Sequence, residues 1–190
     1  MNDFHKWKPL RHDNILPLCG ITYGFGPVPA ILADVAAGLQ YVHSKNVAHA
    51  DLTGSNVLIN RDGRALVADY GLLTTCSDLN GTSYIRSNMR WTAPELSISP
   101  KLESDIYSFG CITYQVLSGE QPYCNICSDH QVVVAILRGV KAKRPVVPVI
   151  EDCHWNLIEQ RWAELSQRPS TPRCSHRYGV AEHGGLEKNE

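Results

Sequence analysis

An acid, an amide and a second acid occur in a fixed order in the middle of the chain. Asp51 and Asn56 lie five residues apart in the run His49-Ala-Asp-Leu-Thr-Gly-Ser-Asn56, and Asp69 follows thirteen residues after Asn56 in Asp69-Tyr-Gly71. Oxygen-bearing side chains of this kind can hold Mg²⁺ on phosphates, and a carboxylate can accept or orient the proton of an attacking hydroxyl. The spacing is therefore suited to phosphoryl transfer.

The segment 56–69 predicts how these residues meet. Its apolar residues on both sides of Asp62-Gly63 indicate two strands and a two-residue turn, because glycine tolerates the positive φ that such turns need. Counting outward from this turn places Val57 opposite Ala68 and Asn56 opposite Asp69. The amide and the carboxylate would then lie side by side at the open end of the hairpin, next to the loop that carries the first acid. An ordinary hairpin with polar ends is the alternative.

The sequence resembles the protein kinase family, and the residues in its motifs are most similar to those of the tyrosine-kinase-like group of serine/threonine kinases. The resemblance covers roughly residues 10 to 170 and rests on five motifs in the family's order. These are His49-Ala50-Asp51-Leu52 with Asn56, Asp69-Tyr70-Gly71, Ala93-Pro94-Glu95, the run from Ser104 to Cys111, and Trp162 followed by Arg168-Pro169.

The resemblance implies the fold and its division. We expect a mainly α chain (α+β by family) that corresponds to the C-terminal lobe of a kinase, helical with a short catalytic β-hairpin. Residues 1–29 would be a remnant of the N-terminal lobe, 30–170 the C-terminal lobe, and 171–190 a polar, disordered tail. Apolar periodicity predicts helices over 30–44, 104–118, 131–139 and 150–165, with a long irregular loop over 72–92.

The resemblance also implies ATP and Mg²⁺ as cofactors and assigns roles to individual residues. The catalytic loop would supply Asp51 to accept or orient the substrate hydroxyl proton, with Thr53 and Asn56 in the same loop. The remaining roles are Mg²⁺ ligation by Asn56 and Asp69, an apolar surface under the adenine at Leu58, a buried ion pair between Glu95 and Arg168, bracing of the catalytic loop by Asp105, and packing by His49.

Departures from the family pattern bear on activity. Thr53 stands where the family has a lysine that neutralises the transferring phosphate, and a hydroxyl supplies no positive charge. Ala50 replaces the loop arginine, and Tyr70 replaces a phenylalanine. Upstream of the catalytic loop the chain has no glycine-rich loop, no ATP-binding lysine and no room for the adenine-binding hinge.

Two functions follow from this mixture of retained and lost features. The first is a protein kinase domain, ATP-dependent on protein serine or threonine, that is weak or inactive as this truncated chain. The alternative is a pseudokinase or truncated gene product that acts as a protein-interaction module. A third hypothesis is that a partner or a missing segment supplies an upper lobe and restores activity. A metal-dependent hydrolase built on His49, Asp51 and Asp69 is an unrelated interpretation, which leaves Ala93-Pro94-Glu95 and Arg168 unexplained.

Composition places the chain among globular domains. Apolar residues make up 43%, charged residues 19%, and the formal net charge is −1. This balance implies a protein substrate or partner rather than nucleic acid or a membrane, and it leaves the oligomeric state open. Seven scattered cysteines predict reduced thiols and a cytoplasmic location. Cys124 and Cys127 have zinc-ligand spacing, but without a second pair we interpret them as two thiols in a loop.

Overall fold

The computed structural model describes residues 28–70, 88–97 and 101–169. The expectations for 1–27, for 71–87 and for the tail lie outside the described residues. The helices are α2 (Val28–Ser44), α4 (Leu102–Ser118), α5 (Asp129–Leu137) and α6 (Asp152–Arg161), and the strands are β1 (Val57–Ile59) and β2 (Ala65–Val67). Short 3-10 turns occur at Gly54–Asn56, Met89–Trp91, Pro94–Ser97 and Leu165–Gln167. The expected mainly helical chain with one short hairpin is confirmed.

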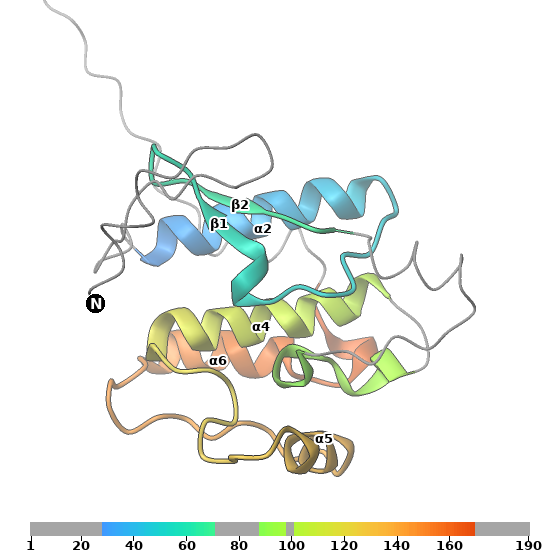
Figure 1. The fold of residues 1–190 in the computed structure, drawn as a ribbon, viewed down its shortest axis with the longest axis vertical. Coiled ribbons are helices and arrows are strands. Elements are labelled where there is room, and N and C mark those ends of the chain that lie inside the picture. Colours follow the sequence, from blue (N-terminus) through green and yellow to red (C-terminus); the bar gives the residue numbers. More distant parts are fainter. Residues whose placement is uncertain (1–27, 71–87, 98–100, 170–190) are drawn as a thin grey trace, which may run out of the picture.

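Helix α4 runs through the middle of the molecule. The hairpin and α2 lie on one side of it, and α6 and α5 lie on the other (Figure 1). Residues are buried all round α4, as expected for a helix with neighbours on every side. Its Ile106, Phe109 and Ile112 pack with α2 in one apolar cluster, whereas its Tyr107 and Tyr114 pack with α5 and α6 in a second.

The hairpin register differs by one residue from the sequence-based expectation. Val57 pairs with Val67 and not with Ala68. The loop holds three residues instead of two, because Gly63 adopts a φ of 77° after a turn closed by its bond from N to the Asn60 carbonyl at 3.1 Å. A turn that ends in a left-handed glycine is the common three-residue hairpin loop. Asn56 is consequently opposite Ala68, whose N–H donates to the Asn56 carbonyl at 2.9 Å.

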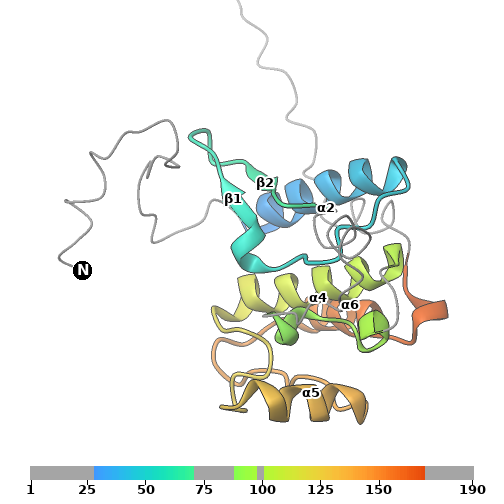
Figure 2. The same ribbon diagram turned by 45° about the vertical axis from the view of Figure 1, so that its right-hand side comes forward.

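A carboxylate on α2 fixes the position of the hairpin. Asp34 accepts hydrogen bonds at 3.0 Å from both the Arg64 side chain and the backbone N–H of Ala65. Behind the strands, Val67 lies so close to Gly38 of α2 that an added Cβ would be 3.1 Å from it. Figure 2 shows the hairpin lying along α2. The helix and the hairpin therefore form one packed unit.

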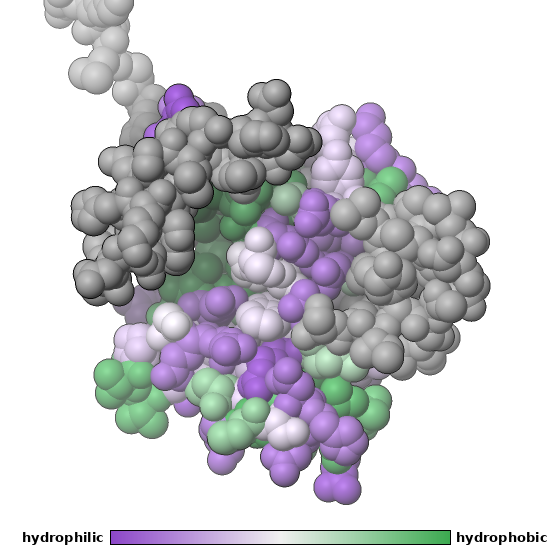
Figure 3. Space-filling model, in the orientation of Figure 1, coloured by the Kyte–Doolittle hydropathy of each residue, from purple (hydrophilic) through white to green (hydrophobic). Residues whose placement is uncertain are grey.

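The outer face of the hairpin is apolar and exposed. Leu58 is 39% exposed, and its cross-strand partner Leu66 is 52% exposed. Figure 3 shows apolar surface in the region of β1. Because residues paired across two strands share a face of the sheet, the two leucines form a small apolar surface beside the predicted catalytic loop.

Helix positions match the apolar periodicity more closely than helix ends do. The helix predicted over 150–165 ends at Arg161, and Leu165–Gln167 forms a separate 3-10 turn. Within the loop predicted over 72–92, Met89–Trp91 is a 3-10 turn. At the first place a 3-10 turn follows the helix instead of continuing it, and at the second a 3-10 turn lies within the predicted loop. Apolar spacing alone does not distinguish a 3-10 turn from a helix end or an irregular loop.

Candidate active site

The loop entering the candidate site is held by a buried acid on α4. Asp105 is 0% exposed, and its two carboxylate oxygens accept hydrogen bonds from the backbone N–H groups of His49 at 2.7 Å and Ala50 at 2.9 Å. The His43 ring nitrogen Nε2 lies 2.7 Å from the same carboxylate. Ala50 adopts a φ of 68°, a strained conformation for a residue with a Cβ. The paired bonds to Asp105 offset that strain and set the direction of the loop.

The buried ring of His49 packs under this loop. Its Nδ1 accepts a hydrogen bond from the backbone N–H of Asp51 at 3.4 Å, and its Nε2 has no hydrogen-bond partner among the described residues. An imidazole in this position orients the backbone of Asp51. Its geometry agrees with the packing role that the resemblance implies.

The structure brings Asp51 and Asn56 together. The Asn56 amide Nδ2 donates to the Asp51 backbone carbonyl at 2.7 Å and lies 3.4 Å from its Oδ2. Since the NH₂ of the amide faces Asp51, the Oδ1 oxygen is directed elsewhere, and it is this carbonyl oxygen that a cation would bind. The Asn56 amide thus contacts Asp51 through its nitrogen and leaves its oxygen as a potential metal ligand.

Asp69 lies one residue beyond the last hairpin pair. Its neighbour Ala68 is bonded to Asn56, so the backbones of Asn56 and Asp69 run close together even though the two residues are not directly opposite each other. Asp69 is exposed and has a φ of 59°, which Asp tolerates better than most residues. The donor set of an amide oxygen and an available carboxylate fits Mg²⁺, which binds oxygen ligands.

Sequence reasoning missed a third contact to the candidate base. Asn88 places its Nδ2 3.4 Å from the Asp51 Oδ1. Each carboxylate oxygen of Asp51 therefore has an amide N–H donor at the outer limit of hydrogen bonding. Asn88 is 37 residues away in the chain, and no local pattern links the two positions.

The side chain of Thr53 is turned into the protein. It is 2% exposed, and its hydroxyl lies 2.8 Å from the hydroxyl of Ser55. The neighbouring Gly54 packs so closely on Gln115 of α4 that an added Cβ would be 2.5 Å from the Gln115 side-chain oxygen. The loop position expected to carry a cation in kinases therefore holds a buried neutral group in this chain.

An ion pair joins the Ala93-Pro94-Glu95 segment to the end of the described chain. Arg168 donates through both terminal nitrogens to the Glu95 carboxylate, with the Nη2–Oε2 distance at 3.0 Å. Ser104 donates to the same carboxylate at 2.9 Å. Burial raises the pKa of Glu95, but the hydrogen bond and charge of Arg168, together with a backbone hydrogen bond and the bond from Ser104, outweigh it, so the net pKa lies below the ordinary value of 4.5.

A second arginine, Arg90, was not singled out from the sequence. Its guanidinium donates to the backbone carbonyls of Tyr123 at 2.8 Å and Ile126 at 2.9 Å, and to the Asp129 carboxylate at 3.0 Å. These bonds tie the segment before Ala93 to the connection between α4 and α5. An arginine next to a tryptophan gives no such signal without the fold, because its partners are carbonyls 33 and 36 residues away.

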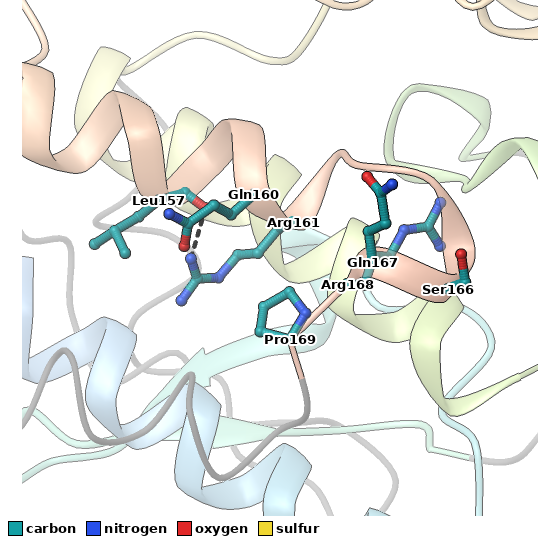
Figure 4. A pocket seen from close by; sticks show the side chains of 7 residues that line it. All are labelled: Leu157, Gln160, Arg161, Ser166, Gln167, Arg168 and Pro169. Carbon is teal, nitrogen blue, oxygen red and sulfur yellow. Dashed lines mark hydrogen bonds between the residues drawn. The ribbon is translucent and has the colours of Figure 1, made fainter.

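A separate cavity lies at the end of α6 and is not part of this site. Figure 4 shows its lining, with Arg161 donating to the Leu157 carbonyl at 2.6 Å. Of the residues singled out from the sequence, only the motif pair Arg168 and Pro169 contributes to this lining, which consists of Leu157, Gln160, Arg161, Ser166, Gln167, Arg168 and Pro169. The predicted nucleotide contact, Leu58, lies instead on the exposed hairpin face.

Comparison with known proteins agrees with this geometry. A family model described as protein tyrosine and serine/threonine kinase matches residues 25–177. A probable serine/threonine-protein kinase of Dictyostelium discoideum is 34% identical over 145 residues, 74% of this chain and 11% of that protein. Human ephrin type-A receptor 1 is 32% identical over 170 residues, covering 84% of this chain and 16% of the receptor. The dual specificity protein kinase pyk3 of D. discoideum is 34% identical over 146 residues, covering 74% and 10%.

The catalytic-loop contacts, the hairpin and the family match together define the class: this chain belongs to the protein kinase family. It spans between 10% and 16% of the length of these three relatives. No helix in the described part of the chain has the length and apolar character to cross a membrane.

Proposed function

We propose that this chain contributes a slow, Mg²⁺- and ATP-dependent phosphoryl transfer to serine or threonine hydroxyls of a protein substrate. The observation that carries the proposal is the contact between Asp51 and Asn56, which holds the carboxylate and turns the amide oxygen outward. In this proposal Asp51 orients the substrate hydroxyl and takes its proton, while Asn56 and Asp69 hold the cation. Bound Mg²⁺ would neutralise charge on the phosphates.

The slow rate follows from Thr53. Phosphoryl transfer depends on positive charge placed where negative charge develops on the phosphate oxygens. The buried hydroxyl of Thr53 supplies none, and its bond to Ser55 turns it away from the loop surface. Positioning by Asp51 and charge neutralisation by the cation are the contributions that remain.

Placing a lysine at position 53, where the kinase family has one, tests this proposal. Transfer of labelled γ-phosphate to casein is measured for the full chain, for Thr53→Lys and for Asp51→Asn, with Mg²⁺ and millimolar ATP. We expect Asp51→Asn to abolish a low wild-type rate and Thr53→Lys to raise that rate about 10-fold or more, the scale of losing or gaining one electrostatic contact. Far-ultraviolet circular dichroism checks that each variant folds. Transfer that persists in Asp51→Asn would refute the assigned base.

A second candidate function is a protein-interaction module without phosphoryl transfer. The observation that favours it is the exposed pair Leu58 and Leu66, because exposed apolar surface beside a site is suited to a protein partner. Thermal unfolding with Mg·ATP discriminates the two candidates, since a ligand of the folded state raises the midpoint. A rise that disappears in Asp69→Asn supports the kinase function. An unchanged midpoint together with absent transfer supports the interaction module.

The partner class and location belong to the same proposal. A protein substrate or partner is favoured over nucleic acid, because the net charge is −1. Free thiols at Cys124, Cys127 and Cys153 are exposed and support a cytoplasmic location, where thiols stay reduced.

A further inference from the structure

Three different metal-binding side chains gather at the start of α6. Glu151 precedes the helix, and Cys153 and His154 lie in its first turn. The Glu151 Oε2 lies 3.6 Å from the Cys153 Sγ and 3.9 Å from the His154 Nδ1. Ligand atoms of all three lie within 4.8 Å of one another, and in the described part of the chain they are the one such group of His, Cys, Asp and Glu.

Two of these separations lie at or near the spacing of ligand atoms in a tetrahedral zinc centre. Bonds of 2.0 to 2.3 Å from Zn²⁺ to nitrogen, oxygen and sulfur place neighbouring ligand atoms about 3.3 to 3.8 Å apart. The oxygen–sulfur distance at 3.6 Å falls in this range, and the oxygen–nitrogen distance at 3.9 Å is just above it. Small side-chain rotations at an exposed surface would complete the geometry, without movement of the helix.

The surrounding charges leave the three side chains available. The neighbouring Asp152 is held by Arg144 at 2.7 Å, so that pair is neutral and separate. The start of a helix carries a partial positive charge of about half an elementary charge, which disfavours a cation. A carboxylate and a thiolate together supply two negative charges, which exceed it. Sulfur and imidazole ligands favour Zn²⁺ over Mg²⁺.

The cysteine pair whose spacing resembles that of zinc ligands lies elsewhere in the chain. Cys124 and Cys127 have the spacing, but the Cys124 thiol donates to the Glu120 carboxylate at 2.9 Å, and neither cysteine belongs to a group of three ligands among the residues that the structure describes. The sequence Glu-x-Cys-His at residues 151–154 does not match the usual spacing of zinc ligands. The helix start, and not the spacing, brings its three ligand atoms together.

We propose that Glu151, Cys153 and His154 bind one Zn²⁺ ion through a carboxylate oxygen, a thiolate sulfur and an imidazole nitrogen, with the fourth position open to water. The Cys153 thiol releases its proton to solvent on binding, because the thiolate is the ligand. The site shares no residue with the candidate phosphoryl-transfer site at Asp51, Asn56 and Asp69.

Cobalt substitution tests this site on the full chain. Reduced, metal-free protein is titrated with Co²⁺, and the near-ultraviolet thiolate-to-cobalt absorption and visible bands of tetrahedral cobalt are recorded. Zn²⁺ is then added to displace the cobalt. The variants are Cys153→Ser, His154→Gln and Glu151→Gln, and Cys124→Ser is the matched control, since it removes another exposed thiol. Circular dichroism confirms that each variant folds, as expected for exposed positions.

The expected result is a thiolate–cobalt band that Cys153→Ser removes, that His154→Gln and Glu151→Gln weaken at least tenfold in affinity, and that Cys124→Ser leaves unchanged. Stoichiometric Zn²⁺ should abolish the band. A band that survives in Cys153→Ser, or one that Cys124→Ser removes, would overturn the assignment. So would the absence of any band in the wild-type chain at millimolar Co²⁺.

Discussion

The acid that supports the loop, Asp105, and the two acids of the candidate active site, Asp51 and Asp69, differ in burial and in hydrogen bonding. Asp105 is fully buried and accepts three close contacts from His43, His49 and Ala50. Asp51 has side-chain contacts only at 3.4 Å, and Asp69 is exposed with no side-chain hydrogen bond within the described residues. Hydrogen bonds within the protein therefore occupy the oxygens of the Asp105 carboxylate, whereas the oxygens of Asp51 and Asp69 remain available to a ligand.

The difference teaches how such a site is built. An acid that is saturated by the protein fixes the backbone, because removing it leaves buried donors without partners. An acid that binds a cation or a substrate proton must keep its oxygens available. The strained φ of Ala50 and Asp69 lies at the two ends of the site, where backbone direction matters most.

The sharpest way to break this comparison is to remove the scaffold acid. Asp105→Ala removes the acceptor of two buried backbone N–H groups, those of His49 and Ala50, so we expect a loss of about 3–5 kcal/mol in the free energy of unfolding. Urea unfolding followed by tryptophan fluorescence measures it. Glu159→Ala, an exposed acid on α6, is the control and should change little. A loss below about 1 kcal/mol would show that the loop holds itself.

A second prediction concerns the Glu95–Arg168 pair. Arg168→Ala should cost about 2 kcal/mol at neutral pH, the scale of hydrogen bonds to charged groups. Because the folded-state pKa of Glu95 is lowered, the pair stabilises the wild type fully above pH 4.5 and loses that contribution as the pH falls through the folded-state pKa.

The pH dependence distinguishes this pair from simple packing. Without Arg168, its hydrogen bond and charge no longer lower the pKa of Glu95, and burial, which raises it, is opposed only by the backbone and Ser104 hydrogen bonds, so the variant should lose less stability than the wild type on acidification below pH 4.5. Unfolding midpoints measured from pH 7 to pH 3 give both curves. Parallel curves would contradict the assigned origin of the lowered pKa.

The third prediction addresses the packing of α4 on α6. A Cβ at Gly110 would lie 2.9 Å from the Cβ of Arg161 and 3.0 Å from the Trp162 indole nitrogen. Since the Cβ of Arg161 moves only with its backbone, Gly110→Ala should destabilise by about 1–3 kcal/mol. Thermal unfolding reports the change. An unaltered midpoint would mean that the two helices separate at little cost.

The smallest expected effect is at the candidate metal ligand. Asp69→Asn keeps a residue that tolerates positive φ and removes one exposed charge, so the free energy of unfolding should change by less than about 0.5 kcal/mol. The same substitution should eliminate any stabilisation by Mg·ATP. Large destabilisation in the absence of nucleotide would place Asp69 with the scaffold acids and end the contrast.

Local patterns predicted the elements, and tertiary contacts decided their details. Apolar periodicity placed α2 and α4 within two residues of their observed starts. The hairpin was predicted from Asp62-Gly63, but its register was wrong by one, because the left-handed Gly63 ends a three-residue loop. Spacing alone does not distinguish a two-residue turn from a three-residue one when both contain the same Asp-Gly.

The candidate site divides in the same way. Asp51 and Asn56 are close in sequence, and their contact follows from the short loop between them. Asn88 and Arg90 bond to partners 33 to 37 residues away, which only the tertiary fold brings near. The zinc ligands at Glu151, Cys153 and His154 depend on side-chain directions at a helix start. The spacing of residues in the sequence does not predict these side-chain directions.

The anchoring of the hairpin to α2 by Asp34 has an entropic consequence. With Arg64 and Ala65 held at 3.0 Å, the strands and their exposed leucines are ordered before anything binds to them. Ordering a segment during association commonly consumes part of the interaction energy, and a surface fixed in advance avoids that loss. A ligand that contacts Leu58 and Leu66 therefore meets strands whose backbone is already fixed to α2, and less of its interaction energy is spent on ordering them.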